Sequence, residues 1–175
     1  SPRYNDSIVS AIEIDIKGSA IYKNRLMMLD IVTNNNWKRP IYFSGGAFDN
    51  EDYLWMKEFL QLEGMVYKLV PVRTQLPKGS SQIDMGQIDT DIMFDKVMRW
   101  DWGNSESLSI YHDPETRRNS ITYRMNLSRL MSKLIAEGKL DKAKKVIDLA
   151  MTKMPVDQFE YYSLVDPFAK GYYDV

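Results

Sequence analysis

The spacing of hydrophobic positions predicts alternating strands and helices in the first part of this 175-residue chain. Between residues 8 and 16, Ile12, Ile14 and Ile16 alternate with acidic residues, as in a half-buried strand. Between residues 22 and 33, hydrophobic residues recur at steps of three and four, which indicates a core-facing helix. The β-favouring run at residues 40–43 should form the next strand.

A second helix and a third strand follow in the same order. Gly45 and Gly46 end the preceding strand, a hydrophobic stripe at residues 53–60 indicates a helix that Gly64 terminates, and residues 66–72 favour a strand. Short loops between alternating elements favour parallel crossover connections. We therefore expect an α/β fold with a small parallel three-stranded βαβαβ sheet and flanking helices. A further helix is expected at residues 89–100.

Residues 127–155 fit the spacing of one tetratricopeptide unit, a helical hairpin whose relatives bind protein partners. The matching positions are Leu127, Leu130, Met131, Leu134, Gly138, Ala143, Ile147 and Pro155. A generic helical hairpin with a glycine turn is the alternative. A second, weaker match begins at Tyr161 or, in a shifted register, at Phe168, and it is interrupted at Val175 before a partner helix.

This pattern predicts three segments and one interaction surface. The segments are an α/β subdomain at residues 1–100, an irregular linker at residues 101–120 and tetratricopeptide-like helices at residues 121–175. One hairpin cannot bury its hydrophobic face alone, so neighbouring surfaces must cover it. Tyr161, Phe168 and Tyr172 are accordingly predicted to bind a partner.

Composition excludes several classes of function. The 23 basic and 24 acidic residues give a net charge of −1, which provides no broad field for nucleic acid. The chain has no cysteine and a single histidine, His112, so thiolate sites and histidine triads are excluded. No hydrophobic run is long enough to span a bilayer. We expect no catalytic residue, no metal, no cofactor and no direct membrane insertion.

Two loops contain candidate ligand-binding residues. Ser44, Gly45, Gly46 and Asp49 lie between a predicted strand and helix, where α/β sheets bind ligands and free amides attract phosphate. The full dinucleotide-binding spacing is missing, so an ordinary tight turn is the alternative. Trp102, beside Gly103, is predicted to be exposed and to contact a glycan or peptide. The alternative is that its ring packs in the core.

Charged clusters have structural interpretations. The acidic run formed by Asp84, Asp89, Asp91 and Asp95 lacks a calcium-loop pattern, so Asp89 and Asp91 are expected to stabilise a helix N-terminus. Lys38 and Arg39 are expected to cap the carbonyl groups at the end of the preceding helix.

A set of ordered motifs covers nearly the whole chain. They are residues 28–30, 35–43, 61–64, 67–71 and 90–93, followed by Trp100, Trp102 and Gly103 and by the repeat-like hairpin. This set resembles the extracytoplasmic C-terminal portion of bacterial multi-spanning membrane proteins related to the protein O-mannosyltransferases, a domain-of-unknown-function family. The resemblance implies a location on the extracytoplasmic, periplasmic face of the cytoplasmic membrane. It also implies that the membrane-embedded part of the same protein is a partner and holds the glycosyl-transfer chemistry.

The two lines of reasoning converge on one functional hypothesis. The chain is expected to be a non-catalytic accessory domain of a membrane glycosyltransferase that binds or positions a protein partner or acceptor. The alternative is an α/β module that binds a glycan or small molecule at Ser44 to Asp49 and at Trp102.

Overall fold

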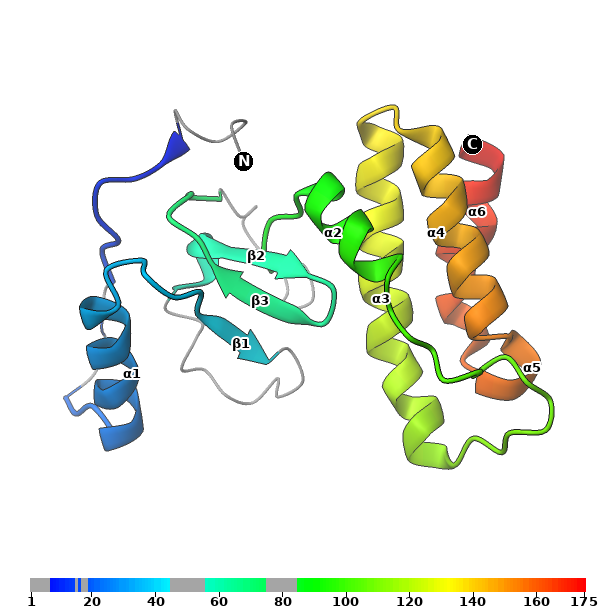
Figure 1. The fold of residues 1–175 in the computed structure, drawn as a ribbon, viewed down its shortest axis with the longest axis horizontal. Helices are drawn as coiled ribbons and strands as arrows, with labels where there is room; N and C mark the ends of the chain where they lie inside the picture. Colours follow the sequence, from blue (N-terminus) through cyan, green and yellow to red (C-terminus); the bar gives the residue numbers. More distant parts are fainter. Residues whose placement is uncertain (1–6, 15, 17–18, 45–55, 75–84) are drawn as a thin grey trace. The chain divides into compact units, whose positions relative to one another are not determined.

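The first part of the chain folds as a helix and a small sheet. The computed structural model describes residues 7–14, 16, 19–44, 56–74 and 85–175. It divides the chain into unit 1, Ser1–Leu62 with Val66–Gln87, and unit 2, Glu63–Met65 with Ile88–Val175. Unit 1 contains α1 (Lys23–Asn34), β1 (Tyr42–Ser44), β2 (Leu60–Glu63) and β3 (Val66–Leu69), with Glu63 of β2 assigned to unit 2 (Figure 1).

The sheet has the order β1-β3-β2 and is antiparallel. In the β1 and β3 pair, Tyr42 is opposite Lys68 and Ser44 is opposite Val66. The Leu69 amide donates a 2.9 Å hydrogen bond to the Ile41 carbonyl, which continues this pairing.

The predicted parallel βαβαβ sheet is therefore wrong. Only Gly64 and Met65 separate β2 from β3, and a parallel crossover needs a dozen or more residues. Gly64 has φ of +80°, a conformation that glycine adopts without a Cβ clash, so it forms a hairpin turn and does not terminate a helix. Within the predicted helix at residues 53–60, residues 56–59 form a 3-10 turn and Leu60 begins β2.

Other predicted elements of this unit have mixed outcomes. The helix expected at residues 22–33 is confirmed as α1, and the strand expected at residues 40–43 corresponds to β1. The strand expected at residues 8–16 does not form in the described residues, where Ile8 makes only an isolated bridge to Val72. The core of unit 1 is formed by buried hydrophobic residues of β2, β3 and the flanking segments. These are Met56, Phe59, Leu60, Leu62, Tyr67, Leu69, Val72 and Met85.

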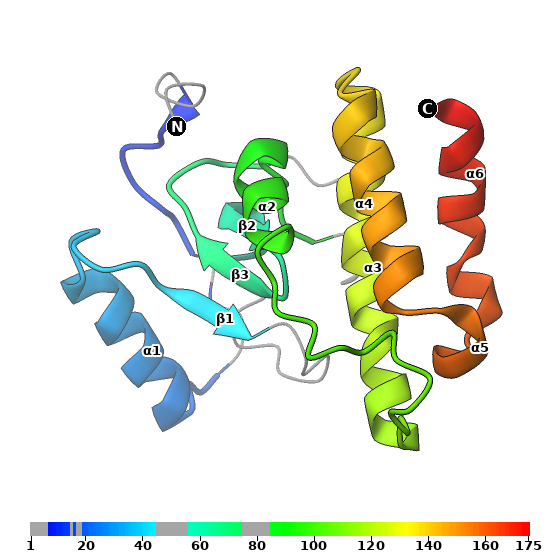
Figure 2. The same ribbon diagram turned by 45° about the vertical axis from the view of Figure 1, so that its right-hand side comes forward.

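Unit 2 is helical. Its elements are α2 (Thr90–Val97), α3 (Pro114–Ala136), α4 (Leu140–Lys153), α5 (Val156–Phe159), the 3-10 turn η4 (Tyr162–Leu164) and α6 (Asp166–Asp174). Figures 1 and 2 show α3 and α4 side by side with α6 against them. The predicted helix at residues 89–100 and the predicted helical hairpin are both present.

Local sequence explains where these helices begin and turn. Asp89 accepts hydrogen bonds from the Asp91 and Ile92 amides at 3.1 Å, which confirms its predicted capping role. Asp113 caps α3 in the same way, and Pro114 occupies the first turn. Gly138, at φ of +70°, forms the turn between α3 and α4.

The hairpin buries the residues that the repeat spacing selected. The matched leucines of α3 and the matched Ala143 and Ile147 of α4 are fully buried. Gly171 of α6 packs so tightly that an added Cβ would lie 2.6 Å from the Met131 sulfur. This close packing fixes α6 against the hairpin, while the tetratricopeptide assignment itself stays a prediction.

Candidate functional site

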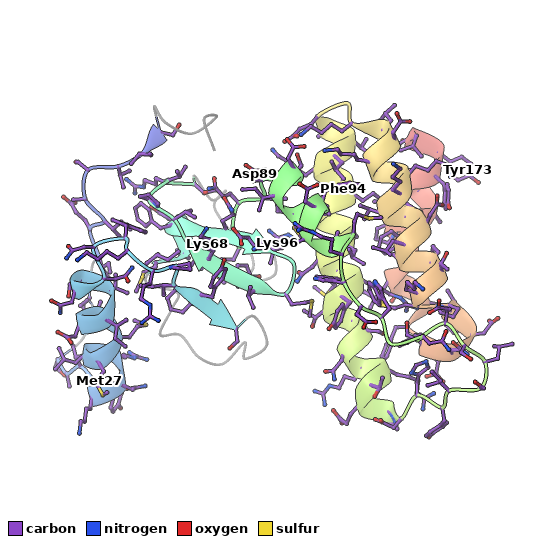
Figure 3. The ribbon with its side chains drawn as sticks, viewed as in Figure 1. Met27, Lys68, Asp89, Phe94, Lys96 and Tyr173 are labelled. Carbon is purple, nitrogen blue, oxygen red and sulfur yellow. The ribbon has the colours of Figure 1, made fainter. Side chains whose placement is uncertain are left out.

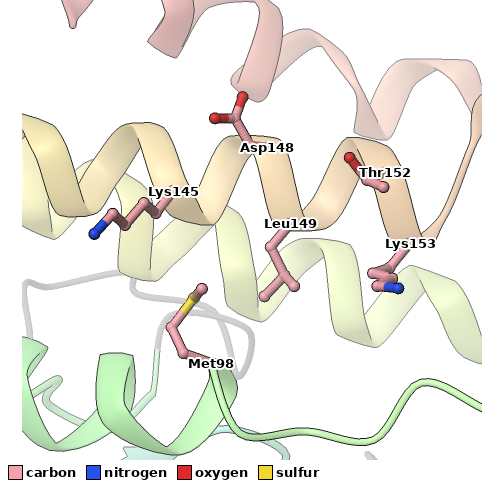
Figure 4. A pocket seen from close by; sticks show the side chains of 6 residues that line it. All are labelled: Met98, Lys145, Asp148, Leu149, Thr152 and Lys153. Atoms are coloured by element: carbon pink, nitrogen blue, oxygen red, sulfur yellow. The ribbon is translucent and has the colours of Figure 1, made fainter.

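A shallow groove of about 320 Å³ lies along one face of α4 in unit 2. Five of its lining residues recur at three- and four-residue steps along α4, and Met98 comes from the end of α2 (Figure 4). The lining residues are Met98, Lys145, Asp148, Leu149, Thr152 and Lys153. Met98 and Leu149 supply hydrophobic surface, and the rest supply polar groups.

Most charged groups of the groove are already paired. Lys153 donates to Glu106, and Asp148 accepts from both Tyr172 and Lys144. The hydrogen bonds from Tyr172 and Lys144 lower the pKa of Asp148. The hydrogen bond between Tyr172 and Asp148 also raises the pKa of Tyr172. Among the residues that the structure describes, none pairs with the Lys145 ammonium. The groove therefore offers one available cation beside a hydrophobic floor.

Four exposed tyrosines lie at the two ends of α6, and together they are called the tyrosine surface. Tyr161 and Tyr162 precede the helix, and Tyr172 and Tyr173 lie in its last turn. Tyr173 is 92% exposed and points away from the helices (Figure 3). Two of these residues, Tyr161 and Tyr172, belong to the predicted partner-binding set. Tyr162 and Tyr173 were missed, although their adjacency to the predicted pair in sequence was visible.

The third predicted partner-binding residue has a different position. Phe168 is fully buried and does not reach the surface. The i to i+4 step from Phe168 to Tyr172 thus separates a core residue from an exposed one. Partner binding at Tyr161 and Tyr172 stays a prediction, and Phe168 contributes to the packing that supports them.

A strained backbone segment precedes the tyrosine surface. Glu160 (φ 58°, ψ −147°) and Tyr161 (φ 53°) both have positive φ, which is costly for residues with side chains. The fully buried Arg124 guanidinium donates to the Glu160 carbonyl and to the Met154 carbonyl at 2.8 Å. Arg117 pairs with the Glu160 carboxylate. These contacts hold Tyr161 in its exposed position.

Burial also changes the pKa of Arg124, whose hydrogen bonds to the Met154 and Glu160 carbonyls act as a clamp on the Glu160 segment. Removal from water lowers the pKa of the Arg124 guanidinium, which still remains protonated at neutral pH. Its two terminal nitrogens donate to peptide carbonyls, while its buried Nε has no hydrogen-bond partner among the described residues. Hydrophobic periodicity gives no signal for such a buried arginine, and the sequence prediction missed it.

An ion-pair network joins α2 to the turn of the hairpin. The Asp91 carboxylate contacts Lys142 at 2.7 Å and Lys139 at 2.9 Å, and the two hydrogen bonds lower its pKa. Lys139 also pairs with Glu137 at 2.9 Å, and Thr90 donates to that carboxylate at 2.6 Å. Asp91 thus has a structural role at the start of α2.

The predicted ligand loop is only partly described. Ser44 is exposed at the end of β1 in unit 1, and Gly45, Gly46 and Asp49 lie outside the described residues. Ligand binding at this loop therefore stays a prediction. Asp84, from the acidic run, also lies outside the described residues.

Trp102, predicted to be exposed, is half-buried in an aromatic cluster of unit 2. Its ring lies 5.6 Å from Trp100 and 5.7 Å from Tyr123, between ring centroids. Its indole N–H is buried and has no hydrogen-bond partner among the described residues. This packing shows a part in the core, and a glycan contact at Trp102 stays a prediction.

The described residues contain no cluster of three or more histidine, cysteine or acidic side chains that could bind a metal ion. His112 packs against Phe159 with 4.2 Å between ring centroids, and its Nε2 is 2.8 Å from the Ser105 carbonyl oxygen. Within the same residues, every helix is too short or too polar to cross a membrane.

Comparisons with known proteins give one match. No curated protein and no solved structure matches the chain. The family model described as TMEM260-associated domain 2 matches residues 1–92, which include α1, the three strands and the first residues of α2. The match agrees with the expectation of a domain-of-unknown-function family tied to a membrane protein. Because it covers more than half of the 175 residues, the chain belongs to the TMEM260-associated domain 2 family.

Proposed function

We propose that this chain is a non-catalytic accessory domain of a membrane glycosyltransferase of the O-mannosyltransferase type. Its helical unit binds a protein partner or acceptor and acts on the extracytoplasmic side of the membrane. The family name, which refers to a transmembrane protein, supports the association with a membrane protein. The observation that carries the binding function is the tyrosine surface on a tightly packed helical support.

The tyrosine surface has the chemistry of a protein interface. Tyrosine provides a large contact area at low entropic cost and is enriched among residues that dominate binding energy. Gly171 and Phe168 anchor the inner side of α6, so the outer side has a fixed geometry. Fixed geometry limits the entropy lost on binding.

The charge of this region indicates the kind of partner. Residues 156–175 contain four acidic residues and one lysine, a net charge of −3. Glu160 is already paired with Arg117, which leaves Asp157, Asp166 and Asp174 as the other acids. A partner segment with arginine or lysine complements both the carboxylates and the tyrosine rings.

The arrangement of acids and bases supports a non-catalytic role. The acids with lowered pKa values include Asp91 and Asp148, and each is held by a lysine within its own unit. Such pairs stabilise the ionised carboxylates, so neither Asp91 nor Asp148 is poised to donate a proton near neutral pH. The membrane-embedded part of the protein then supplies the transfer chemistry.

Site-specific photocrosslinking tests partner binding. A photoreactive phenylalanine analogue is placed at Tyr173 of the 175-residue chain, and at Leu108 as a control with similar exposure of 90%. In extracytoplasmic membrane preparations from the native host, position 173 should give a discrete protein adduct that excess unlabelled chain competes away. The adduct should weaken in a Tyr162→Ser background. Equal adducts from both positions, or none from position 173, contradict the proposal.

A transfer assay tests the non-catalytic role separately. The chain is incubated with polyprenyl-phosphate-linked mannose and a serine- or threonine-containing acceptor protein. We expect no mannose transfer by this chain alone. Transfer above the rate without protein would show that the chain is itself catalytic.

A further inference from the structure

Helix α1 is the least buried helix of the described structure. None of its 12 residues is buried, and the four that are half-buried (Arg25, Met28, Leu29 and Val32) lie on one side of the helix. Figures 1 and 2 show α1 on the β1 side of the sheet within the same unit. The rest of the helix faces solvent.

The solvent-facing part of α1 is unusually hydrophobic. Of the 17 exposed large hydrophobic residues among those described, seven lie between residues 21 and 42. The side chains central to the argument are Tyr22, Leu26, Met27, Ile31 and Trp37. Leu26, Met27 and Ile31 lie on α1 itself, and Tyr22 and Trp37 lie in the segments on either side of it. A concentration of exposed hydrophobic side chains in one short segment is typical of a surface that another phase or molecule covers.

The loop after α1 holds an exposed tryptophan in a fixed position. Asn36 and Trp37 have φ values of 47° and 57°, and Trp37 is 54% exposed. The Asn35 side-chain amide donates to the Arg39 carbonyl at 2.7 Å, and the Lys38 amide donates to the Asn35 carbonyl at 2.9 Å. Positive φ at a bulky residue is strained, and strain that is held by specific contacts indicates a functional constraint.

The same region carries positive charge. Residues 19–44 contain four cations and one acid, Asp30, for a net charge of +3 in a chain of net charge −1. Among the described residues, no acid pairs with Lys23, Lys38 or Arg39, and the predicted capping of α1 by Lys38 and Arg39 is not formed. Asp30 is engaged by the Asn34 amide at 2.9 Å.

We propose that this α1 surface, formed by Tyr22, Leu26, Met27, Ile31 and Trp37 with Lys23, Lys38 and Arg39, binds an anionic phospholipid surface. The cations contact lipid phosphates, and the hydrophobic side chains reach the boundary between headgroups and acyl chains. Trp37 is suited to this boundary because its ring is amphipathic.

The distribution of residues favours lipid over protein. At 100° per residue, Lys23 lies between the flank of Tyr22 and Leu26 and the flank of Met27 and Ile31. Protein interfaces are depleted of lysine at their centre, whereas at a lipid surface lysine can reach the headgroups. The contact is peripheral and needs no spanning segment.

Vesicle flotation with the 175-residue chain tests the proposal. The probes are vesicles of phosphatidylcholine alone and of phosphatidylcholine with phosphatidylserine. We expect binding to the anionic vesicles, roughly tenfold weaker binding to the neutral ones, and loss of binding at high salt because ions screen the charges. The intrinsic tryptophan fluorescence should shift to shorter wavelength on binding, and Trp37→Phe should remove most of this shift.

Matched variants distinguish this surface from general charge effects. Lys38→Gln with Arg39→Gln should weaken binding to anionic vesicles roughly tenfold or more. Lys133→Gln with Lys170→Gln changes the net charge equally at exposed positions of unit 2 and should leave binding within roughly twofold of wild type. All four positions are exposed, and unchanged circular dichroism confirms that the variants fold.

Three outcomes overturn the proposal. These are absence of binding to anionic vesicles, equal loss of binding in the two double variants, and capture of a protein by the α1 surface while vesicle binding is unaffected by the variants. Crosslinking from Tyr173 reports on the other surface, so the two proposals fail independently.

Discussion

Two helices of this chain, α1 and α3, have contrasting environments despite similar hydrophobic side chains. Helix α1 buries none of its 12 residues, while α3 buries seven of its 23, including Leu127, Leu130 and Leu134. Helix α3 contacts α2, α4, α5 and α6, which together cover its hydrophobic side. Hydrophobic content alone therefore does not determine burial, and the number of packed neighbours does.

The difference teaches where stability and interaction are located. Side chains of α3 lose surface to their neighbours and contribute to folding. Side chains of α1 remain in solvent and contribute little until a binding surface covers them. Substitutions that are chemically identical should therefore have unequal effects in the two helices.

The largest expected effect comes from a matched pair of leucines. Leu130→Ala, at a fully buried position, should lower the free energy of unfolding of the helical unit by about 2–5 kcal/mol, since it leaves a cavity. Leu26→Ala, at a position that is 59% exposed, should change stability by less than about 0.5 kcal/mol. Native-state hydrogen exchange of α3 and α4 amides measures the first, and exchange of α1 amides measures the second. Equal effects would remove the contrast between the helices.

The next effect concerns the buried arginine. Arg124→Met removes the donors to the Met154 and Glu160 carbonyls and should destabilise the helical unit by about 1–3 kcal/mol, because buried acceptors lose their partners. Exchange of the amides at residues 156–165 should rise more than exchange at the start of α4.

Arg118→Met is the matched control, since Arg118 lies six residues before Arg124 on α3 and is exposed. Its effect should stay within about 0.5 kcal/mol. If Arg124→Met were neutral, the clamp on the strained Glu160 segment would contribute nothing to the fixed position of Tyr161.

The hairpin was predictable because its determinants are local. The helical repeats of Leu127, Leu130 and Leu134, and the left-handed turn at Gly138, are set by residues within a few positions of one another. The caps at Asp89 and Asp113 are local as well, and Asp89 was identified in advance.

The sheet was not predictable from the same kind of pattern. Gln61, Leu62 and Glu63 are good helix formers, yet all are buried as part of β2, so tertiary burial overrides their propensity. Gly64 is compatible with a helix end and with a hairpin turn, and only the pairing of β2 with β3 distinguishes them. The ion-pair network at Asp91 could not be predicted from local patterns either, because Lys139 and Lys142 lie 48 and 51 residues further along the sequence.

An effect of similar size to that of Arg124→Met tests the hairpin turn between β2 and β3. Gly64→Ala should cost about 1–3 kcal/mol, because φ of +80° disfavours a Cβ and the added atom would lie 2.6 Å from the Trp100 ring. Gly103→Ala, also at positive φ but with no atom within 4 Å, isolates the backbone contribution and should cost about 1 kcal/mol. Thermal unfolding followed by tryptophan fluorescence measures both. If Gly64→Ala lowered stability no more than Gly103→Ala, the Trp100 ring would have moved aside at no energetic cost.

The smallest effect is the acid sensitivity of the network at Asp91. Lys142 and Lys139 lower the pKa of Asp91 in the folded chain below its unfolded value. The ionised carboxylate therefore adds stability above the unfolded pKa of about 3.9, and this contribution is lost as the pH falls toward the folded pKa. The side chain is 42% exposed, so solvent screens the pairs and the gain should stay below about 1 kcal/mol.

Asp91→Asn should lower stability at neutral pH and reduce the decline of stability between about pH 5 and pH 2. Asp95→Asn is the control on the same helix, since its exposed carboxylate has no ion pair among the described residues. High salt should shrink the difference between the two variants because both lysine contacts are partly exposed. Parallel declines in wild type and Asp91→Asn would mean that the lysines of the hairpin do not hold α2 through this carboxylate. In that case, the packing of α2 against α3 would be what holds α2 in place.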